Sequence, residues 1–181
     1  MELIKNLREA SIIKSLFLAL LGTIILALSA KVKIPFWPVP MTMQTFVVLM
    51  LGIVYGWKLG LFTVTLYLFE GIFGLPVFAG TPEKGLGIIY FTGPTMGYLL
   101  GFLITVSLTG LINFNNSFFK NILKLVFSVS FIYILGVIWL GYVIGWDKPL
   151  FKLGVQPFLL AELFKISILA FLIPKIKNFS L

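Results

Sequence analysis

Apolar residues occur along this chain in runs long enough to cross a lipid bilayer, and short segments rich in charge, glycine and proline separate them. A membrane-spanning helix needs about 20 mostly apolar residues. Divided at the charges and turn signals, the sequence predicts six transmembrane helices, over about residues 14–30, 41–55, 58–71, 93–112, 122–145 and 155–174. We therefore expect an all-α integral membrane protein that forms a single domain over residues 1–181.

The composition excludes most soluble classes of protein. Hydrophobic residues make up 60% of the chain and charged residues 11%, whereas soluble domains have about 45–50% and about 25%. A soluble domain of this size cannot bury so much apolar surface, and a disordered chain needs low hydrophobicity. The net charge of +8 is better explained by basic residues that flank membrane helices and face anionic lipid than by nucleic acid. We expect a multi-pass protein of the cell membrane.

The distribution of Lys and Arg predicts the orientation of the chain in the membrane. Cytoplasmic segments carry an excess of these residues. An orientation with both termini in the cytoplasm places more of them on the inner side than on the outer side.

The first 13 residues mix polar and apolar positions and predict a short amphipathic helix on the membrane surface.

Three outer segments, residues 31–40, 71–92 and 146–154, are then rich in glycine, proline and aromatic residues. Segment 71–92 contains too much glycine and proline for a regular helix, yet it is too apolar for an ordinary solvent loop. Such a segment is tolerated at membrane depth where it is buried against protein. We expect the loops after the first and third helices, loops 1 and 3 of the chain, to cap a substrate cavity.

Two ionisable residues, Glu162 and Lys165, lie inside the last predicted helix. Their i, i+3 spacing places them on one helix face. An ionisable side chain at the centre of a membrane helix costs at least about 2.5–3.5 kcal/mol, so both must face the protein interior or a cavity. One interpretation is a self-neutralising ion pair that fixes helix packing. The other is a ligand site, which the three unusual outer loops favour.

The chemistry of such a site follows from its donors and acceptors. A carboxylate only accepts hydrogen bonds and an ammonium only donates them, so the pair suits a ligand with N–H and C=O groups, such as a urea or an amide. Gln44, near the outer face, offers both roles. Several aromatic residues either line an apolar ring site or form the interfacial aromatic belt; they are Phe36, Trp37, Phe78, Tyr90, Tyr98 and Trp146.

Small residues recur every four positions in the first helix, at Ser15, Ala19, Thr23 and Ala27. Such a stripe allows two helices to approach closely. It either packs within this chain or docks against another membrane protein.

The chain lacks His and Cys, which excludes the common triads with a histidine base, thiol redox chemistry and the usual zinc sites. We expect no enzyme, no metal and no cofactor. An intramembrane enzyme using Glu162 and Lys165 as acid and base would lack a nucleophile, and a channel would need polar residues along its whole length. Because no Gly-Lys dipeptide of the Walker A type occurs, energy for transport would have to come from partners.

Four segments together resemble the BioY family, the biotin-specific S components of energy-coupling factor (ECF) transporters. They are PVPMTMQT at 38–45, GLPVFAG at 74–80, YFTGPTMGYLLGF at 90–102 and PFLLAELFK at 157–165. The chain departs from the family pattern at two positions, since Glu162 stands where the family usually has Asp and Met96 where it usually has Gly.

The resemblance implies high-affinity capture of biotin for uptake, with biotin as the transported ligand and not a cofactor. It implies that a transmembrane coupling subunit and two ABC ATPases supply the energy, and that the stripe on the first helix docks on the coupling subunit. The expected biotin-binding residues are Gln44, Phe78, Tyr90, Tyr98, Glu162 and Lys165. An S component for another vitamin or small heterocycle, or a stand-alone facilitator, remains the alternative.

Overall fold

The computed structural model describes the backbone of residues 2–35, 37–115 and 117–176, and the side chains of the same ranges from residue 12 onward. The elements in chain order are α1 (Glu2–Lys31), β1 (Lys33–Ile34), β2 (Met41–Thr42), α2 (Gln44–Ile72), the 3-10 helix η1 (Gly87–Thr92), α3 (Met96–Leu111), α4 (Phe118–Ile144), α5 (Leu150–Gly154), the 3-10 helix η2 (Gln156–Phe158) and α6 (Leu159–Ile176). The two-residue strands β1 and β2 pair antiparallel, with Lys33 opposite Thr42. The all-α prediction is confirmed.

The helix α2 consists of two antiparallel arms that reverse direction at Gly56. This residue has φ 70° and ψ 177°, a conformation that glycine adopts without the steric cost of a Cβ. The Gln44 side-chain amide donates a hydrogen bond of 2.8 Å to the Tyr67 hydroxyl. At a rise of 1.5 Å per residue, a continuous helix would separate these positions by roughly 35 Å. The helices predicted over 41–55 and 58–71 are therefore the two arms of α2.

Within the described part of the chain, four stretches are long and apolar enough to cross a membrane, namely Ile12–Lys31, Gln44–Ile72, Phe118–Ile144 and Leu150–Ile176. The helix α3 is also apolar but has only 16 residues. Large apolar side chains stay exposed on the outside of the bundle, including Phe17 on α1, Phe127 on α4 and Phe164 on α6. An apolar exterior of this kind is the surface expected of helices that face lipid.

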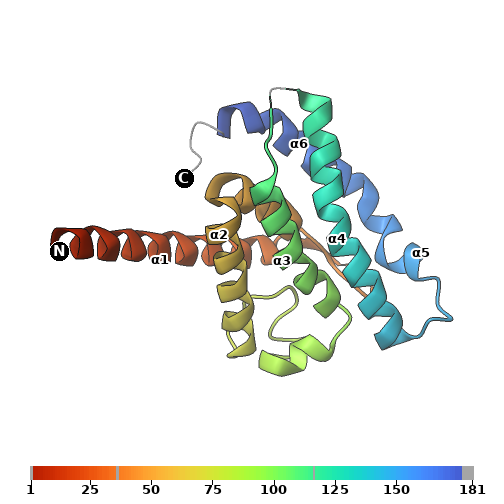
Figure 1. Cartoon of the computed structure of the whole chain (residues 1–181). Coiled ribbons are helices and arrows are strands. Elements are labelled where there is room, and N and C mark those ends of the chain that lie inside the picture. Colours follow the sequence, from red (N-terminus) through yellow and green to blue (C-terminus); the bar gives the residue numbers. More distant parts are fainter. Residues whose placement is uncertain (1, 36, 116, 177–181) are drawn as a thin grey trace.

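Glycines bring α3 and α4 close together beside the candidate site. α3 packs against both α2 and α4, as Figure 1 shows. A Cβ on Gly101 of α3 would lie 2.5 Å from the Cα of Ile132 on α4, so this close contact requires glycine. A Cβ on Gly136 would lie 2.3 Å from the ring of Tyr98. Gly136 therefore leaves the space that the Tyr98 ring occupies between the two helices.

The helix α1 runs without a break from residue 2, so the segment predicted as a separate amphipathic helix is continuous with the first predicted span. Its N-terminal part extends beyond the other helices in Figure 1. The side chains of residues 1–11 lie outside the described residues, and the placement of this segment on the membrane surface stays a prediction.

The small-residue stripe on α1 packs within the chain. Ala19 is 0% and Thr23 2% exposed, and a Cβ on the adjacent Gly22 would lie 2.5 Å from Thr63 on α2. In this arrangement Ala19 and Thr23 are not accessible to a partner protein, because small side chains let α2 approach there. Ser15 and Ala27 keep part of their surface accessible.

Candidate ligand-binding site

A cavity lies among α2, α3, α4 and α6, next to the segments that precede α2 and α3. Its lining is mainly aliphatic and aromatic, with a few convergent polar groups, as is typical of small-molecule sites. The lining residues are Val39, Pro40, Met41, Thr42, Gln44, Thr45, Ala79, Tyr90, Thr95, Tyr98, Leu99, Phe102, Ile132, Tyr133, Phe158, Glu162 and Lys165. Gln44, Tyr90, Tyr98, Glu162 and Lys165 were predicted from sequence, and the structure brings these five together.

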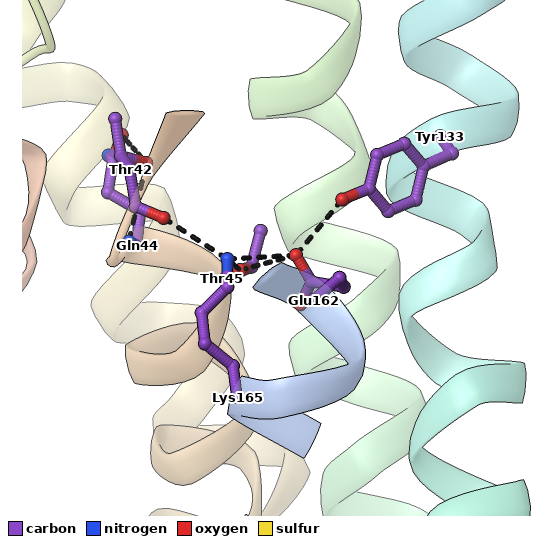
Figure 2. Close-up of polar contacts among 6 residues, drawn as sticks. All are labelled: Thr42, Gln44, Thr45, Tyr133, Glu162 and Lys165. Atoms are coloured by element: carbon purple, nitrogen blue, oxygen red, sulfur yellow. Dashed lines mark hydrogen bonds and ion pairs between the residues drawn. The ribbon is translucent and has the colours of Figure 1, made fainter. Parts of the chain in front are cut away.

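Glu162 and Lys165 form a buried ion pair on α6. The Lys165 Nζ lies 2.9 Å from Glu162 Oε2, and the two residues are 6% and 4% exposed. Lys165 Nζ also donates to the Thr42 carbonyl at 3.2 Å and to the Thr45 hydroxyl. Figure 2 shows these contacts converging between α2 and α6. Since an ammonium has three protons, all three donors of Lys165 are already used.

The two carboxylate oxygens of Glu162 have very different surroundings. Oε2 accepts hydrogen bonds from Lys165, from the Thr45 hydroxyl at 2.9 Å and from the Tyr133 hydroxyl at 3.0 Å. Oε1 is buried and has no hydrogen-bond partner. A buried acceptor without a donor costs free energy until water or a ligand supplies one. Glu162 lines the cavity, and Oε1 is its carboxylate oxygen that is still free to accept an N–H or O–H group.

Local structure explains why a carboxylate is tolerated at this position. Glu162 lies in the first turn of α6, directly after η2 with its Pro157. The N-terminal end of a helix carries a partial positive charge, which stabilises an anion there. Glu162 is thus held by the helix end, by Lys165 and by two hydroxyl donors.

Gln44 connects the two arms of α2 to the loop that follows them. Its amide nitrogen donates to the Tyr67 hydroxyl, and that hydroxyl donates to the Val77 carbonyl at 2.9 Å. Its side-chain oxygen accepts a hydrogen bond of 3.2 Å from the Thr42 hydroxyl. The amide therefore already has protein partners on both sides, and its role in the cavity includes holding the surrounding chain in place.

Two tyrosines line the cavity with their hydroxyls fixed by backbone carbonyls. Tyr98 donates to the Gly154 carbonyl and Tyr90 to the Ala79 carbonyl, each at 2.9 Å. Burial raises the pKa of the Tyr90 hydroxyl, so this group stays a neutral donor at physiological pH. Since their hydroxyls are fixed in this way, both tyrosines present mainly their rings to a ligand.

Phe78 was predicted to contact substrate, and the structure places it behind the cavity. It is 1% exposed, with ring centroids 4.8 Å from Tyr90, 5.2 Å from Tyr67 and 5.3 Å from Phe91. Its ring occupies the space next to Gly71, where a Cβ would lie 2.0 Å away. Phe78 supports Tyr90 and does not line the cavity.

Two of the other aromatic candidates, Trp37 and Trp146, are 76% and 65% exposed and do not line the cavity. Their exposure fits the alternative of an interfacial aromatic belt. Phe36 lies outside the described residues.

Sequence reasoning missed Thr45 and Tyr133, the two hydroxyl donors to Glu162, and Phe158 in η2, directly before α6. Thr45 follows Gln44 directly in the sequence, so its position beside a predicted site residue could have identified it. Tyr133 shares its long apolar run with other hydroxyl side chains, namely Ser128, Ser130 and Tyr142, so the sequence does not single it out. Over the residues that the structure describes, no group of three His, Cys, Asp or Glu side chains is placed to hold a metal ion.

Comparisons with known proteins agree with this architecture. The model of the BioY family matches residues 4–180. The chain is 34% identical over 158 residues to a probable biotin transporter BioY of Pyrococcus horikoshii, covering 87% of this chain and 89% of that protein. It is 34% identical over 157 residues to a biotin transporter BioY of Thermotoga maritima, covering 86% and 91%.

A solved structure shares the fold. The crystal structure of the S-component for biotin from an ECF-type ABC transporter matches with a TM-score of 0.77 at 24% identity, over 93% of both chains. The apolar spans and these relatives identify a multi-pass protein of the cell membrane. The family model matches nearly the whole chain, and the relatives are similar to it over most of their length. The chain therefore belongs to the BioY family.

Proposed function

We propose that this chain binds biotin in the cavity beside Glu162 and is the substrate-binding subunit for biotin uptake across the cell membrane. The curated relatives are named as biotin transporters, and the similar solved structure is an S-component for biotin. The chain is then a transport protein and not an enzyme, and biotin is its transported ligand.

The observation that carries the proposal is Glu162, which lines the apolar cavity and has a buried Oε1 without a hydrogen-bond partner. Biotin has a ureido group with N–H donors next to an apolar thioether ring. A ureido N–H would satisfy Oε1, and the rings of Tyr90, Tyr98 and Phe158 offer apolar contact surface for the bicycle. Lys165 balances the charge of Glu162, and it would donate to the ligand only by giving up one of its three acceptors.

The arrangement in the membrane follows from counting the arms of α2 separately. With α1, the two arms, α3, α4 and α6 as six crossings, both termini lie on the same side of the membrane, which we infer to be the cytoplasm. The cavity then lies near the outer surface, because Val39, Ala79 and Tyr90 line it from the segments between α1 and α2 and between α2 and α3. The loops 31–40 and 71–92 would cap it. A positive-inside distribution of Lys and Arg supports this orientation.

We propose that partner proteins supply the energy for transport. The similar S-component comes from an ECF-type ABC transporter, and this sequence has no Walker A motif. We infer a transmembrane coupling subunit and two ABC ATPases as partners. Ser15 and Ala27, with the exposed apolar side chains of α1, are the available contact surface on that helix.

Calorimetric titration of biotin into the purified full chain in detergent tests the proposal. The expected result is saturable binding of one biotin, with no comparable heat for thiamine or riboflavin under the same conditions. The proposal would be contradicted if a monodisperse sample that unfolds cooperatively on heating did not bind biotin. Binding of another vitamin instead would identify an S component of different specificity.

A further inference from the structure

The segment Val77–Thr81 forms part of the rim of the cavity, through Ala79, and is called the roof segment below. It contains no regular helix or strand, so its backbone carbonyls are not paired by a regular ladder. The Tyr67 hydroxyl on α2 donates to the Val77 carbonyl, and the Tyr90 hydroxyl of η1 donates to the Ala79 carbonyl. Side chains from other elements therefore hold the roof segment in place.

Lys31, the last residue of α1, supplies a third attachment. Its Nζ donates to the Phe78 carbonyl at 3.2 Å, to the Thr81 carbonyl at 3.2 Å and to the Thr81 hydroxyl at 3.1 Å. The Thr81 hydroxyl in turn donates to the Phe78 carbonyl at 2.7 Å. Between them Gly80 has φ 81°, the left-handed conformation that turns the chain. One ammonium thus holds both ends of a tight turn.

The donor residue and the acceptor residues of this contact are buried to different degrees. Phe78 and Thr81 are 1% and 7% exposed, whereas Lys31 is an exposed residue at the end of its helix. A cation in the last turn is stabilised by the negative end of the helix dipole. Removing the ammonium would take away a charged donor from acceptors that the fold has already withdrawn from water, and that loss is larger than the loss of a solvent-exposed contact.

We propose that Lys31 is a positioning residue that fastens the roof segment to the end of α1, so that access to the cavity depends on the position of this helix end. The other two attachments come from α2 and η1, which flank the roof segment in sequence. Lys31 is 47 residues away from Phe78 and belongs to a different helix. Only the naming of biotin as the ligand rests on the proposed function.

Thiol labelling of the apo protein tests the attachment without any ligand. The chain contains no cysteine, so Ala79→Cys introduces a single thiol at a position that is 4% exposed and lines the cavity. With Lys31 intact, labelling by a water-soluble maleimide is expected to be slow. Lys31→Met removes all three hydrogen bonds of the ammonium. Adding it should accelerate labelling at least about tenfold, the factor that corresponds to the loss of a single charge-assisted hydrogen bond. Lys31→Arg keeps the donors and should label as slowly as the parent.

The matched control is Lys33→Met, which removes the same charge from an exposed residue two positions further along the chain. Thr81→Val removes the hydroxyl from the other side of the contact and should act in the same direction as Lys31→Met. It provides an independent reading if Lys31→Met does not yield folded protein. Equal labelling rates with and without Lys31→Met, or equal acceleration by Lys33→Met, would overturn the assignment.

The rate of biotin release tests whether Lys31 also affects retention of the ligand. Radiolabelled biotin is expected to dissociate about tenfold faster from Lys31→Met than from the parent, while Lys33→Met releases it at the parental rate. Unchanged release from Lys31→Met would overturn the role in ligand retention. If the parent chain does not bind biotin at all, the proposed function fails, and the labelling rates still decide the role of Lys31.

Discussion

The Tyr133 hydroxyl on α4 donates a hydrogen bond of 3.0 Å to Glu162 Oε2 on α6, as Figure 2 shows. The two residues are 29 positions apart in sequence and lie on different helices, and their contact belongs to the same cluster as Lys165 and Thr45. Three donors on Oε2 fix the carboxylate so that only Oε1 remains for a ligand. The arrangement predicts that ligand affinity depends on the groups that hold the Glu162 carboxylate in place.

Tyr133→Phe is expected to weaken biotin binding about tenfold while leaving the fold intact. The substitution removes one hydrogen bond to a charged group, worth about 1.5–3 kcal/mol, and it retains the ring contacts with Tyr98 and Phe158. Calorimetry measures the affinity. Tyr142→Phe is the matched control, because Tyr142 lies on the same helix and is 76% exposed. Equal affinities for the two variants would show that Tyr133 does not position Glu162.

Lys165→Met is expected to abolish biotin binding and to lower thermal stability. It leaves the Glu162 carboxylate buried without its counter-ion, which costs about 3–5 kcal/mol. The melting temperature in detergent and a biotin titration measure the two effects, with the exposed Lys175→Met on the same helix as control.

The double variant Glu162→Gln with Lys165→Met separates stability from binding. Replacing both charges removes the unpaired carboxylate, so stability should return towards that of the parent. Biotin binding should stay absent, because the pair that orients the acceptor is gone. Recovery of binding in the double variant would argue against a ligand role for the ion pair.

Glu162→Asp should uncouple the carboxylate from Tyr133. The shorter side chain withdraws the carboxylate towards α6 by roughly one methylene, while the i, i+3 relation to Lys165 is kept. In this background Tyr133→Phe is expected to change biotin affinity less than it does with Glu162. A double-mutant cycle measures the difference. A coupling as large as in the parent would mean that the backbone adjusts to restore the contact.

Gly56→Ala is expected to destabilise the chain by about 1–3 kcal/mol through backbone strain alone. No atom outside the adjacent residues and the nearby helix backbone lies within 4 Å of a Cβ built at Gly56, so the substitution creates no clash with packed neighbours, but its φ of 70° is unfavourable for alanine. The melting temperature should fall, and the neighbouring exposed Lys58→Ala should leave it unchanged. An unchanged melting temperature for Gly56→Ala would mean that the reversal tolerates a side chain.

Local sequence patterns are enough to predict the long apolar helices and one face of the site. Apolar runs of membrane length predict the helices, and the reversal at Gly56 lies where the sequence separates two shorter apolar segments. The spacing of Glu162 and Lys165 places them together because neighbours three apart on a helix always share a face. These features depend on local geometry, which the order of residues along the chain sets directly.

The tertiary structure decided which faces of distant segments meet. Phe78 lies behind the cavity because Gly71 leaves space for its ring, and Ala19 is buried because α2 packs on that side of α1. Tyr133 lies next to Glu162 because α4 and α6 pack against each other at this depth. Residue periodicity gives the direction of a side chain relative to its own helix, whereas its neighbours depend on how helices rotate and pack against one another.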